Sequence, residues 1–479
     1  MAEPELNPTG EPVSVPADSD PVVIALRAAL GDSAVLTGTD VSGRSAGIWR
    51  SDTIQAKAIV RPQSTEEVAT VMRICHEHGQ PVVAHGGLTG LVASGLTAND
   101  EIALSLERMA AIEEVHELDR TMVVQAGAVL QVIQETAEEH GLLFPLDLGG
   151  RGSCTIGGNL STNAGGNRVV RYGMARDMVL GLEVVLADGT VLSSMNRMIK
   201  NNAGFDLKQL FVGTEGSLGV ITRAVLRLRE APAKRATMFV GVESFDKLGR
   251  FLKQFDAATG GTLSAFEVLW NNFYSVVTTQ PAQQQAPLAQ NLPYYVLVEA
   301  IGSDNAAAEA ALADALEQEL IADAVLAQNE AQRQNLWAMR DDVEQCFRYA
   351  PVYTFDVSLR LSCMEAYVGE VNERLAEAFP DSDVRNFTFG HLGDGNLHFV
   401  VSVGKDVEET EAVREDVERC VYEPLAAIEG SISGEHGIGL EKKPWLAISR
   451  TPVEVALMRQ LKSSLDPKGL LNPGKIFDV

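Results

Sequence analysis

The chain has 479 residues, 46% of them hydrophobic and 22% charged, which is typical of a globular protein too long for one core and predicts about two or three domains. Its formal net charge of −26 would repel a phosphate backbone, which argues against nucleic acid as a partner. An anionic substrate would therefore need local positive charge from a metal, Arg or Lys.

The cysteines, the apolar stretches and the N-terminus indicate a cytoplasmic protein. The five cysteines are widely spaced without a C-x-x-C pair, which is typical of reduced thiols. No apolar stretch approaches the ~18 residues that a membrane span needs. Residues 1–20 are acidic and Pro-rich, with neither a basic start nor an apolar run. We expect them to be disordered rather than a signal peptide.

Residues 58–99 predict a strand, a helix, a second strand and a glycine turn. The apolar residues 58–60 form the first strand, and Ser64 then begins a helix with cap-type and acidic residues. Gly79 ends this helix. Residues 81–84 form a second short strand, and the glycine-rich turn 85–90 follows it.

Residues 121–230 predict a second alternating unit. Residues 122–127 form a strand and residues 129–140 a helix. A long glycine-rich stretch, 149–166, precedes a strand at 182–186. Asp188-Gly189 then forms a hairpin turn between two apolar runs.

Residues 229–234 mark a predicted domain boundary. Beyond it, residues 278–292 are polar and of low complexity, which predicts a surface loop. Residues 304–336 are Ala-rich and predicted to be helical, and residues 337–340 end that helix. Residues 387–389 and 397–401 are predicted strands.

Three segments are rich in glycine: residues 86–95, 149–166 and 213–219. Successive backbone N–H groups in such loops can bind the anionic pyrophosphate of a cofactor. None of the segments is a Walker A loop or a nicotinamide-binding G-x-G-x-x-G turn. The alternative is that they are ordinary turns, but three in one chain favour a cofactor.

Only three histidines follow residue 140, and all lie in two glycine-rich motifs. If the first motif is a hairpin centred on Asp394-Gly395, His391 faces His398 with Cβ atoms ~4.5–5.5 Å apart, which suits two ligands of one metal ion. Glu435 is the best third ligand, and His436 remains free to move a proton. The alternative is a stacked histidine pair in a core, with Glu435 and His436 at a helix start.

Residues 81–95, 149–173 and 201–222 resemble the FAD-binding half of the vanillyl-alcohol oxidase / p-cresol methylhydroxylase superfamily. The resemblance implies FAD, with its pyrophosphate in the first two loops and the third segment along the flavin. Some members tether FAD through a histidine where this chain has Leu88. We therefore expect non-covalent FAD, with His85 capping its own loop. The residues assigned to FAD in this way are His85, Gly86, Gly87, Leu88, Thr89, Gly90, Leu91, Ser94, Pro145, Leu148, Gly149, Gly152, Ser153, Thr155, Ile156, Gly157, Gly158, Ser161, Thr162, Gly165, Gly166, Tyr172, Gly173, Glu215, Gly216, Gly219, Val220, Ile221 and Asn472.

The two histidine motifs and residues 465–475 resemble the FAD-dependent D-2-hydroxy acid dehydrogenases, from about residue 50 onward. In that group the matching residues bind a divalent metal, usually zinc or manganese, and the histidine after the glutamate is the base. The resemblance thus implies the metal ligands His391, His398 and Glu435, and the catalytic base His436.

The same resemblance implies substrate contacts at Arg340, Asn396 and Thr354, with Arg340 on a substrate carboxylate. The alternative for Arg340 is a surface arginine on an acidic protein. The hydroxyglutarate enzymes carry a lysine where this chain has Thr354, and Glu344 replaces a polar residue one turn beyond the arginine. Both changes weaken the case for a second substrate carboxylate.

The resemblance also implies the fold class and the domains. We expect an α+β protein with an FAD-binding domain of p-cresol methylhydroxylase type in two subdomains, a ferredoxin-like substrate domain and a C-terminal return segment. After the disordered residues 1–20, the expected ranges are 21–230 for FAD, 231–428 for substrate and 429–479 for the segment that completes the active site.

The expected reaction is FAD- and metal-dependent oxidation of a D-2-hydroxy acid, with D-2-hydroxyglutarate favoured over D-malate or D-lactate. His436 takes the hydroxyl proton and the C2 hydrogen leaves as hydride toward flavin N5. An electron-transfer flavoprotein, a quinone or a cytochrome would accept the electrons, and a homodimer is compatible with the sequence. The alternatives are an oxygen-using alcohol or sugar-acid oxidase of the same superfamily, and a metal-dependent hydrolase.

Overall fold

The computed structural model describes residues 17–479. Most of the segment expected to be disordered, residues 1–20, lies outside the described residues. Residues Ala17–Ser19, however, form a 3-10 turn. The Asp20 carboxylate accepts hydrogen bonds from the backbone N–H groups of Val22 (2.9 Å) and Val23 (3.4 Å), and so caps helix α1 (Pro21–Leu30). The expectation of disorder is therefore wrong for residues 17–20.

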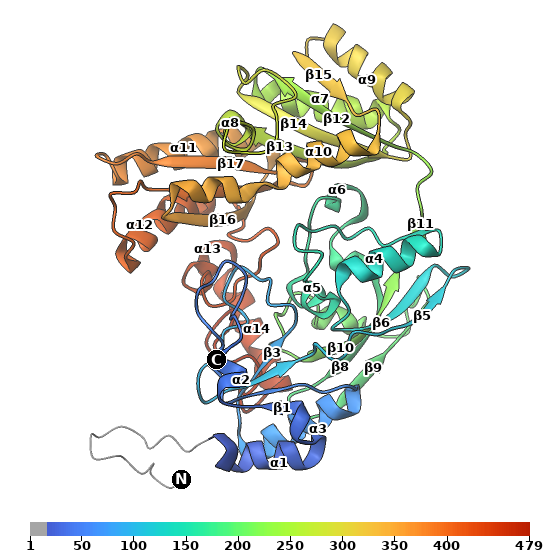
Figure 1. The fold of residues 1–479 in the computed structure, drawn as a ribbon, viewed down its shortest axis with the longest axis vertical. Coiled ribbons are helices and arrows are strands. Elements are labelled where there is room, and N and C mark those ends of the chain that lie inside the picture. Colours follow the sequence, from blue (N-terminus) through green and yellow to red (C-terminus); the bar gives the residue numbers. More distant parts are fainter. Residues whose placement is uncertain (1–16) are drawn as a thin grey trace.

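A four-stranded sheet lies in the lower half of Figure 1, in the strand order β1-β2-β4-β3. Its three parallel strands are largely buried, which explains why they read as apolar runs without alternation. The predicted helix is confirmed as α3, which Ser64 caps and which Gly79 ends in the left-handed conformation. The elements are β1 (Val35–Leu36), α2 (Thr39–Ser42), β2 (Ala58–Val60), α3 (Thr65–His78), β3 (Val82–His85) and β4 (Ile102–Ser105).

A five-stranded antiparallel sheet follows, in the order β5-β6-β10-β8-β9. Its residues share one hydrophobic core with α3 and the first sheet. The predicted strand and helix at 122–127 and 129–140 are confirmed as β6 and α4, and Asp188-Gly189 lies in the turn between β8 and β9. The elements are β5 (Ile112–His116), β6 (Thr121–Gln125), α4 (Leu130–Glu139), β7 (Leu142–Leu143), α5 (Ile156–Thr162), α6 (Val169–Tyr172), β8 (Val179–Val185), β9 (Val191–Ser194), β10 (Val220–Arg227) and β11 (Arg229–Glu230), which pairs with β7.

A seven-stranded antiparallel sheet forms the upper half of Figure 1. Its first part has the strand order β15-β12-β14-β13, with one helix connecting β12 to β13 and another connecting β14 to β15. This is the expected ferredoxin-like unit. A second unit, which the sequence did not reveal, repeats the pattern without a fourth strand and joins the first through β13 and β17. The elements are β12 (Arg235–Val242), α7 (Phe245–Ala258), β13 (Leu263–Trp270), α8 (Asn271–Thr278), β14 (Tyr294–Ile301), α9 (Asn305–Glu317), β15 (Asp323–Leu326), α10 (Glu330–Asp341), β16 (Val352–Ser358), α11 (Met364–Ala378), β17 (Arg385–His391), β18 (Asn396–Ser402) and α12 (Glu411–Tyr422).

The composition of the Ala-rich stretch 304–336 predicted one continuous helix, and this prediction is wrong. Helix α9 ends at Glu317, and Glu319 adopts a left-handed conformation with φ of 53°. Strand β15 then pairs with β12 before α10 begins. Sheet pairing and the burial of Leu320 and Ile321 outweigh helix propensity here.

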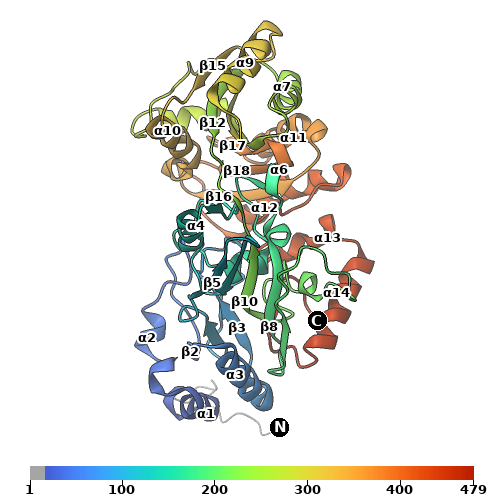
Figure 2. The same cartoon turned by 90° about the vertical axis from the view of Figure 1, so that its right-hand side faces the viewer.

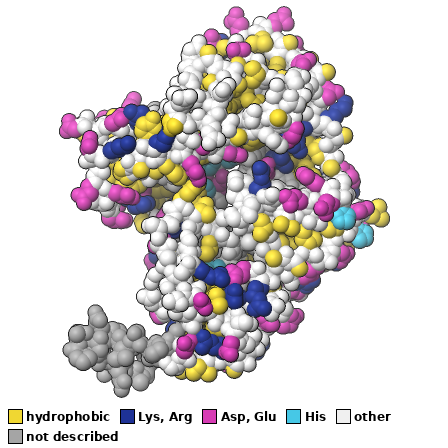
Figure 3. Space-filling view, in the orientation of Figure 1, with side chains coloured by type: hydrophobic (Ala, Val, Ile, Leu, Met, Phe, Trp, Pro, Cys, Tyr) yellow, Lys and Arg dark blue, Asp and Glu magenta, His cyan; other side chains and the backbone are white. Residues whose placement is uncertain are grey.

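The chain after α12 returns to the lower half, where Figures 1 and 2 show helices α13 (Leu446–Ser449) and α14 (Pro452–Leu465). Leu471 joins the core of the first two sheets and forms a parallel bridge with Val82 on β3. Acidic side chains are spread over the face drawn in Figure 3, with Lys and Arg between them. Among the described residues, no helix has the length and apolar character to cross a membrane.

Candidate active site

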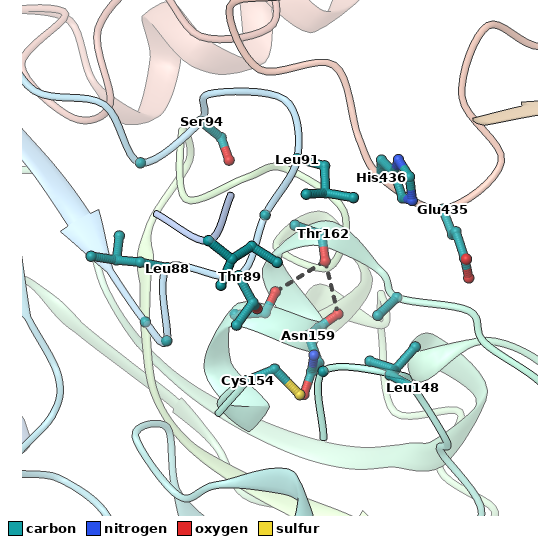
Figure 4. Close-up of a pocket in the computed structure, with 18 of the residues that line it drawn as sticks. Leu88, Thr89, Leu91, Ser94, Leu148, Cys154, Asn159, Thr162, Glu435 and His436 are labelled. Atoms are coloured by element: carbon teal, nitrogen blue, oxygen red, sulfur yellow. Dashed lines mark hydrogen bonds between the residues drawn. The ribbon is translucent and has the colours of Figure 1, made fainter. Parts of the chain in front are cut away.

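A cavity of about 770 Å³ lies where the glycine-rich loops meet the seven-stranded sheet, and its volume is typical of a cofactor or small-molecule site. It brings together most of the residues predicted to bind the cofactor, several of which Figure 4 labels. Those that line it are His85, Gly86, Gly87, Leu88, Thr89, Gly90, Leu91, Ser94, Leu148, Gly149, Ser153, Thr155, Gly157, Gly158, Ser161, Thr162, Gly165, Gly166, Glu215, Gly216, Gly219, Val220, Ile221 and Asn472.

Five residues of the predicted set are absent from this lining: Pro145, Gly152, Ile156, Tyr172 and Gly173. Ile156 is fully buried in the core beneath the loop. Gly173 ends α6 with φ of 78°.

Two lining residues that sequence reasoning missed, Cys154 and Asn159, appear in Figure 4. They lie between predicted residues of the same loop, and the glycine pattern gave no signal for them.

Glycine is required where the first two loops touch. A Cβ at Gly87 would lie 2.1 Å from the carbonyl oxygen of Ser153, and a Cβ at Gly86 would lie 2.6 Å from Thr155 Oγ1. The first glycine loop therefore packs directly on the backbone of the second. This contact sets the shape of the cavity between them.

Replacing Gly87 with alanine should raise the dissociation constant of the cofactor about 5- to 150-fold, because overpacking costs roughly 1–3 kcal/mol and the Ser153 backbone must shift. The measurement is flavin retained after gel filtration, followed by titration with FAD. Gly369→Ala in α11, where a new Cβ meets nothing within 4 Å, is the matched control. Equal FAD affinity in both variants would show that the loop contact does not shape the site.

Two buried polar atoms in the cavity wall fit a polar ligand. Thr155 Oγ1 and Asn159 Oδ1 have no hydrogen-bond partner within the described chain, and both residues line the cavity. Buried polar atoms are normally paired, so polar groups of a ligand would satisfy them. The cavity therefore fits a polar ligand, such as the pyrophosphate-containing cofactor that the glycine pattern predicts.

The first histidine motif is a hairpin, but its predicted register is wrong. His398 pairs with Phe389 rather than with His391, because a 3-10 turn at Leu392–Asp394 replaces the expected two-residue turn. The register is thereby displaced by two residues. Side chains alternate along a strand, so an even displacement keeps both histidines on one face. Their ring centroids are 5.2 Å apart.

Glu435 completes a ligand group with these two histidines. Its Oε1 lies 3.5 Å from His391 Nε2 and 3.6 Å from His398 Nε2, and the three ligand atoms lie within 4.8 Å of one another. Its Oε2 accepts a hydrogen bond from the backbone N–H of Gly166 (2.5 Å), which ties the group to the glycine loop. Two imidazoles and a carboxylate with one side open to a cavity fit a catalytic zinc-type site.

The charges around this group favour a cation. Burial opposes a charge on His391, yet the Glu267 carboxylate raises its pKa to about 10. Burial and the nearby His391 lower the pKa of His398 to about 3. Although burial works against it, hydrogen bonding and charge from His391 hold the pKa of Glu435 at about 2. At neutral pH His398 therefore keeps a lone pair and Glu435 is ionised, whereas His391 is protonated, so a metal ion bound there would displace the His391 proton.

Arg340 is buried beside the ligand group. Its Nε donates to Glu267 (2.8 Å), and Glu267 also accepts a hydrogen bond from His391 Nδ1 (2.9 Å). One carboxylate thus orients both a candidate metal ligand and a candidate substrate contact. Arg340 and Thr354 line the cavity, as does Glu344, which accepts a hydrogen bond from Trp49 Nε1 (3.3 Å).

Asn396 lies apart from the cavity lining. Its side-chain N–H₂ donates to Asp356 Oδ1 (2.7 Å) and to the carbonyl oxygen of Val357 (2.8 Å). The structure therefore places this residue behind the site rather than at its surface.

His436 lines the cavity next to Glu435, and Figure 4 shows both on one loop. Its imidazole ring is stacked against that of His398, with ring centroids 5.7 Å apart. Asp356, His398 and His436 also lie close enough to share an ion. Asp356, however, already accepts hydrogen bonds from three backbone N–H groups and from Asn396, which makes it a poor metal ligand.

Sequence reasoning missed two buried carboxylates, Asp356 and Glu267. Each is the single charged residue within an apolar strand, β16 and β13 respectively. That isolation was the available signal, because a buried charge needs a partner.

Comparison with known proteins adds two family matches. The FAD binding domain model matches residues 56–194, and that of the C-terminal domain of FAD linked oxidases matches residues 231–476. The chain is 42% identical to a D-2-hydroxyglutarate dehydrogenase of Xanthomonas citri pv. viticola over 428 residues, which cover 88% of this chain and 89% of that protein. It is 36% identical to one of Stutzerimonas stutzeri over 466 residues, covering 96% and 99%.

Solved structures share the fold at low identity. A p-cresol methylhydroxylase with bound substrate superposes with a TM-score of 0.73 at 15% identity, covering 95% of this chain and 96% of that one. An alkyldihydroxyacetonephosphate synthase superposes with a TM-score of 0.72 at 17% identity, covering 99% and 87%. The expected α+β architecture of p-cresol methylhydroxylase type is confirmed.

Proposed function

The chain belongs to the FAD-linked oxidases, in the group of FAD-dependent D-2-hydroxy acid dehydrogenases, and from this premise we propose that it oxidises a D-2-hydroxy acid to the 2-oxo acid. The supporting observation is that one cavity contains the glycine loops, the group His391, His398 and Glu435, and the side chains of His436 and Arg340. Groups suited to the cofactor, the substrate oxygens and the hydroxyl proton thus face one space.

The glycine loops would hold FAD without a covalent bond. When bound, FAD supplies the acceptor for the hydride that leaves C2 of the substrate. His85 is buried and pairs through Nε2 with the carbonyl oxygen of Gly95 (2.9 Å), so it serves its own loop. Thr155 and Asn159 would donate to or accept from the polar groups of the cofactor.

His391, His398 and Glu435 would hold a divalent metal, zinc or manganese. When bound, the metal lowers the pKa of the substrate hydroxyl and fixes the orientation of the substrate. His436 takes the hydroxyl proton, while Arg340, held in place by Glu267, binds the substrate carboxylate. Loss of that proton and of the C2 hydride leaves the 2-oxo acid.

The names of the relatives favour D-2-hydroxyglutarate as the substrate. D-Malate and D-lactate are the next candidates because they share the D-2-hydroxy acid group. Thr354 and Glu344 both line the cavity, and both would contact the part of the substrate beyond C2. A carboxylate at that end would approach the acid Glu344 rather than a lysine. Comparing turnover of acids with and without a second carboxylate therefore tests the proposed roles of Thr354 and Glu344.

Purified protein should show a flavin absorbance spectrum, and acid precipitation should release the flavin as free FAD. With a redox dye, a panel of D-2-hydroxy acids should give turnover that a chelator removes, with D-2-hydroxyglutarate, D-malate and D-lactate as the first compounds. Hydrogen peroxide release during turnover would identify an oxygen-using oxidase. A colourless, FAD-free but active protein would contradict the proposal and point to a hydrolase.

The division of the chain and its partners are part of the proposal. Residues 21–230 would bind FAD, residues 231–428 the substrate, and residues 429–479 would complete the site, in agreement with the separate cores on either side of residue 230. The reduced cofactor would pass electrons to an external acceptor, such as an electron-transfer flavoprotein or a quinone. A homodimer is part of the same expectation.

A further inference from the structure

The loop 433–437 carries Glu435 and His436 as neighbours, and the fully buried Asp356 lies beneath it. Building on the proposed function, we propose that Asp356 is the positioning residue that holds this loop, so that the candidate metal ligand and the candidate proton acceptor are fixed as one unit. Asp356 does not line the cavity, so its effect would pass through the loop.

A single carboxylate oxygen of Asp356 binds the loop backbone. Its Oδ2 accepts hydrogen bonds from the N–H groups of Gly434 (3.0 Å), Glu435 (2.9 Å) and His436 (2.9 Å), and from the hydroxyl of Ser433 (3.2 Å). Three successive N–H groups that converge on one anion form a backbone nest. Hydrogen bonds to an ionised acceptor are stronger than neutral ones, so this contact fixes the loop firmly.

Two further contacts complete the arrangement around the carboxylate. Asn396 donates to Asp356 Oδ1 (2.7 Å), and a Cβ at Gly434 would lie 2.2 Å from Asn396 Nδ2. Glycine at 434 therefore allows the loop to approach both side chains. Lys442 Nζ lies 3.6 Å from Asp356 Oδ2 and donates to the carbonyl oxygens of Asp356 (3.1 Å) and Ile432 (2.9 Å), so the buried charge has a cation nearby.

The strand pairing explains why this position suits an anchor. Asp356 on β16 is the direct partner of His398 on β18, so the residue that holds the loop is opposite a candidate ligand. Ser358 and Ser431 form an isolated bridge that fixes the loop where it leaves the sheet. Asp356 therefore links the backbone of Glu435 to His398 by a short path, while the backbone N–H of Gly166 holds the Glu435 side chain from the other side. Asn396, which was expected from the sequence to contact substrate, donates a hydrogen bond to Asp356 and so helps to hold it in place.

The test is Asp356→Asn in the full-length FAD-loaded protein. Both carboxylate oxygens of Asp356 accept hydrogen bonds, whereas asparagine has one oxygen and one N–H₂ group. The N–H₂ group of the variant would therefore face either the loop N–H groups or the Nδ2 donor of Asn396. Hydrogen exchange of the 434–436 amides should become at least about tenfold faster, because their acceptor is weakened. The dissociation constant for Zn²⁺, titrated into chelator-treated protein, should rise by about 10–100-fold, the usual effect of an outer-shell partner.

Asp383→Asn is the matched control, since that exposed aspartate lies in the loop just before β17 and pairs only with Arg385 among the described ion pairs. Asn396→Ala should change exchange and Zn²⁺ affinity in the same direction by a smaller factor, and it serves as the readout should Asp356→Asn fail to fold. Wild-type exchange at 434–436 in the folded variant, or faster exchange with unchanged Zn²⁺ affinity, would overturn the proposal. Wild-type protein that neither binds Zn²⁺ nor oxidises any D-2-hydroxy acid would instead contradict the proposed function, and Asp356 would then be judged by exchange alone.

Discussion

Replacing His436 with alanine should lower kcat by about two to four orders of magnitude while FAD and metal contents stay at wild-type levels. A positioned base contributes a factor of this size, and no other imidazole of the cavity is free to act. His391 and His398 face Glu435 in the ligand group, and His85 pairs with Gly95 in its own loop. Stopped-flow reduction of the flavin by substrate measures the effect directly, because it isolates the step that needs the proton removed.

Two comparisons make this result specific. His140→Ala removes an exposed histidine that pairs with Glu117, and it should leave flavin reduction unchanged. The variant His436→Ala should also keep its Zn²⁺ affinity, since the imidazole is not among the three proposed ligands. Flavin reduction within tenfold of wild type would show that another group takes the proton.

Removing the metal should abolish turnover, and His391→Ala should prevent its return. The variant loses one of three protein ligands, so its Zn²⁺ affinity should fall by more than about 100-fold, beyond the effect of an outer-shell partner. Metal analysis of the purified protein, followed by addition of Zn²⁺ or Mn²⁺ to chelator-treated samples, provides the measurement. Turnover should recover in the wild type alone.

His116→Ala, which removes an exposed histidine paired with Asp119, is the matched control for the metal experiment and should recover fully. His391→Ala also removes one of the two side chains, His391 and Arg340, that donate hydrogen bonds to Glu267, so FAD content must be shown to be unchanged. Full metal content in His391→Ala, together with turnover that a chelator does not affect, would exclude this ligand group.

The site could be located from the sequence because its residues follow short-range rules. The caps at Ser64 and Gly79 set the limits of α3, and glycine density marked the loops that line the cavity. The two histidines of the hairpin were placed together despite an incorrect turn. Strand alternation has a period of two, so a displacement of two residues changed the partner and kept the face.

What the sequence did not reveal depends on contacts between distant segments. Asp356 binds the backbone of a loop about eighty positions later, and no local pattern encodes that acceptor. Glu267 meets His391 only because β13 and β17 join the two ferredoxin-like units. Strand β15 likewise exists because β12 offers an edge, which composition alone could not show.

The return of the chain to β3 also constrains when the cofactor can be captured. Asn472 accepts a hydrogen bond from the backbone N–H of Ala84 (2.9 Å) across 388 positions and donates to the carbonyl oxygen of Glu215 (2.5 Å). During synthesis on the ribosome, one wall of the cavity therefore stays open until this asparagine has emerged. A contact of such long range is slow to form, because closing the long loop between its partners costs chain entropy. We therefore expect the cavity to retain flavin tightly only after Asn472 has docked between β3 and Glu215.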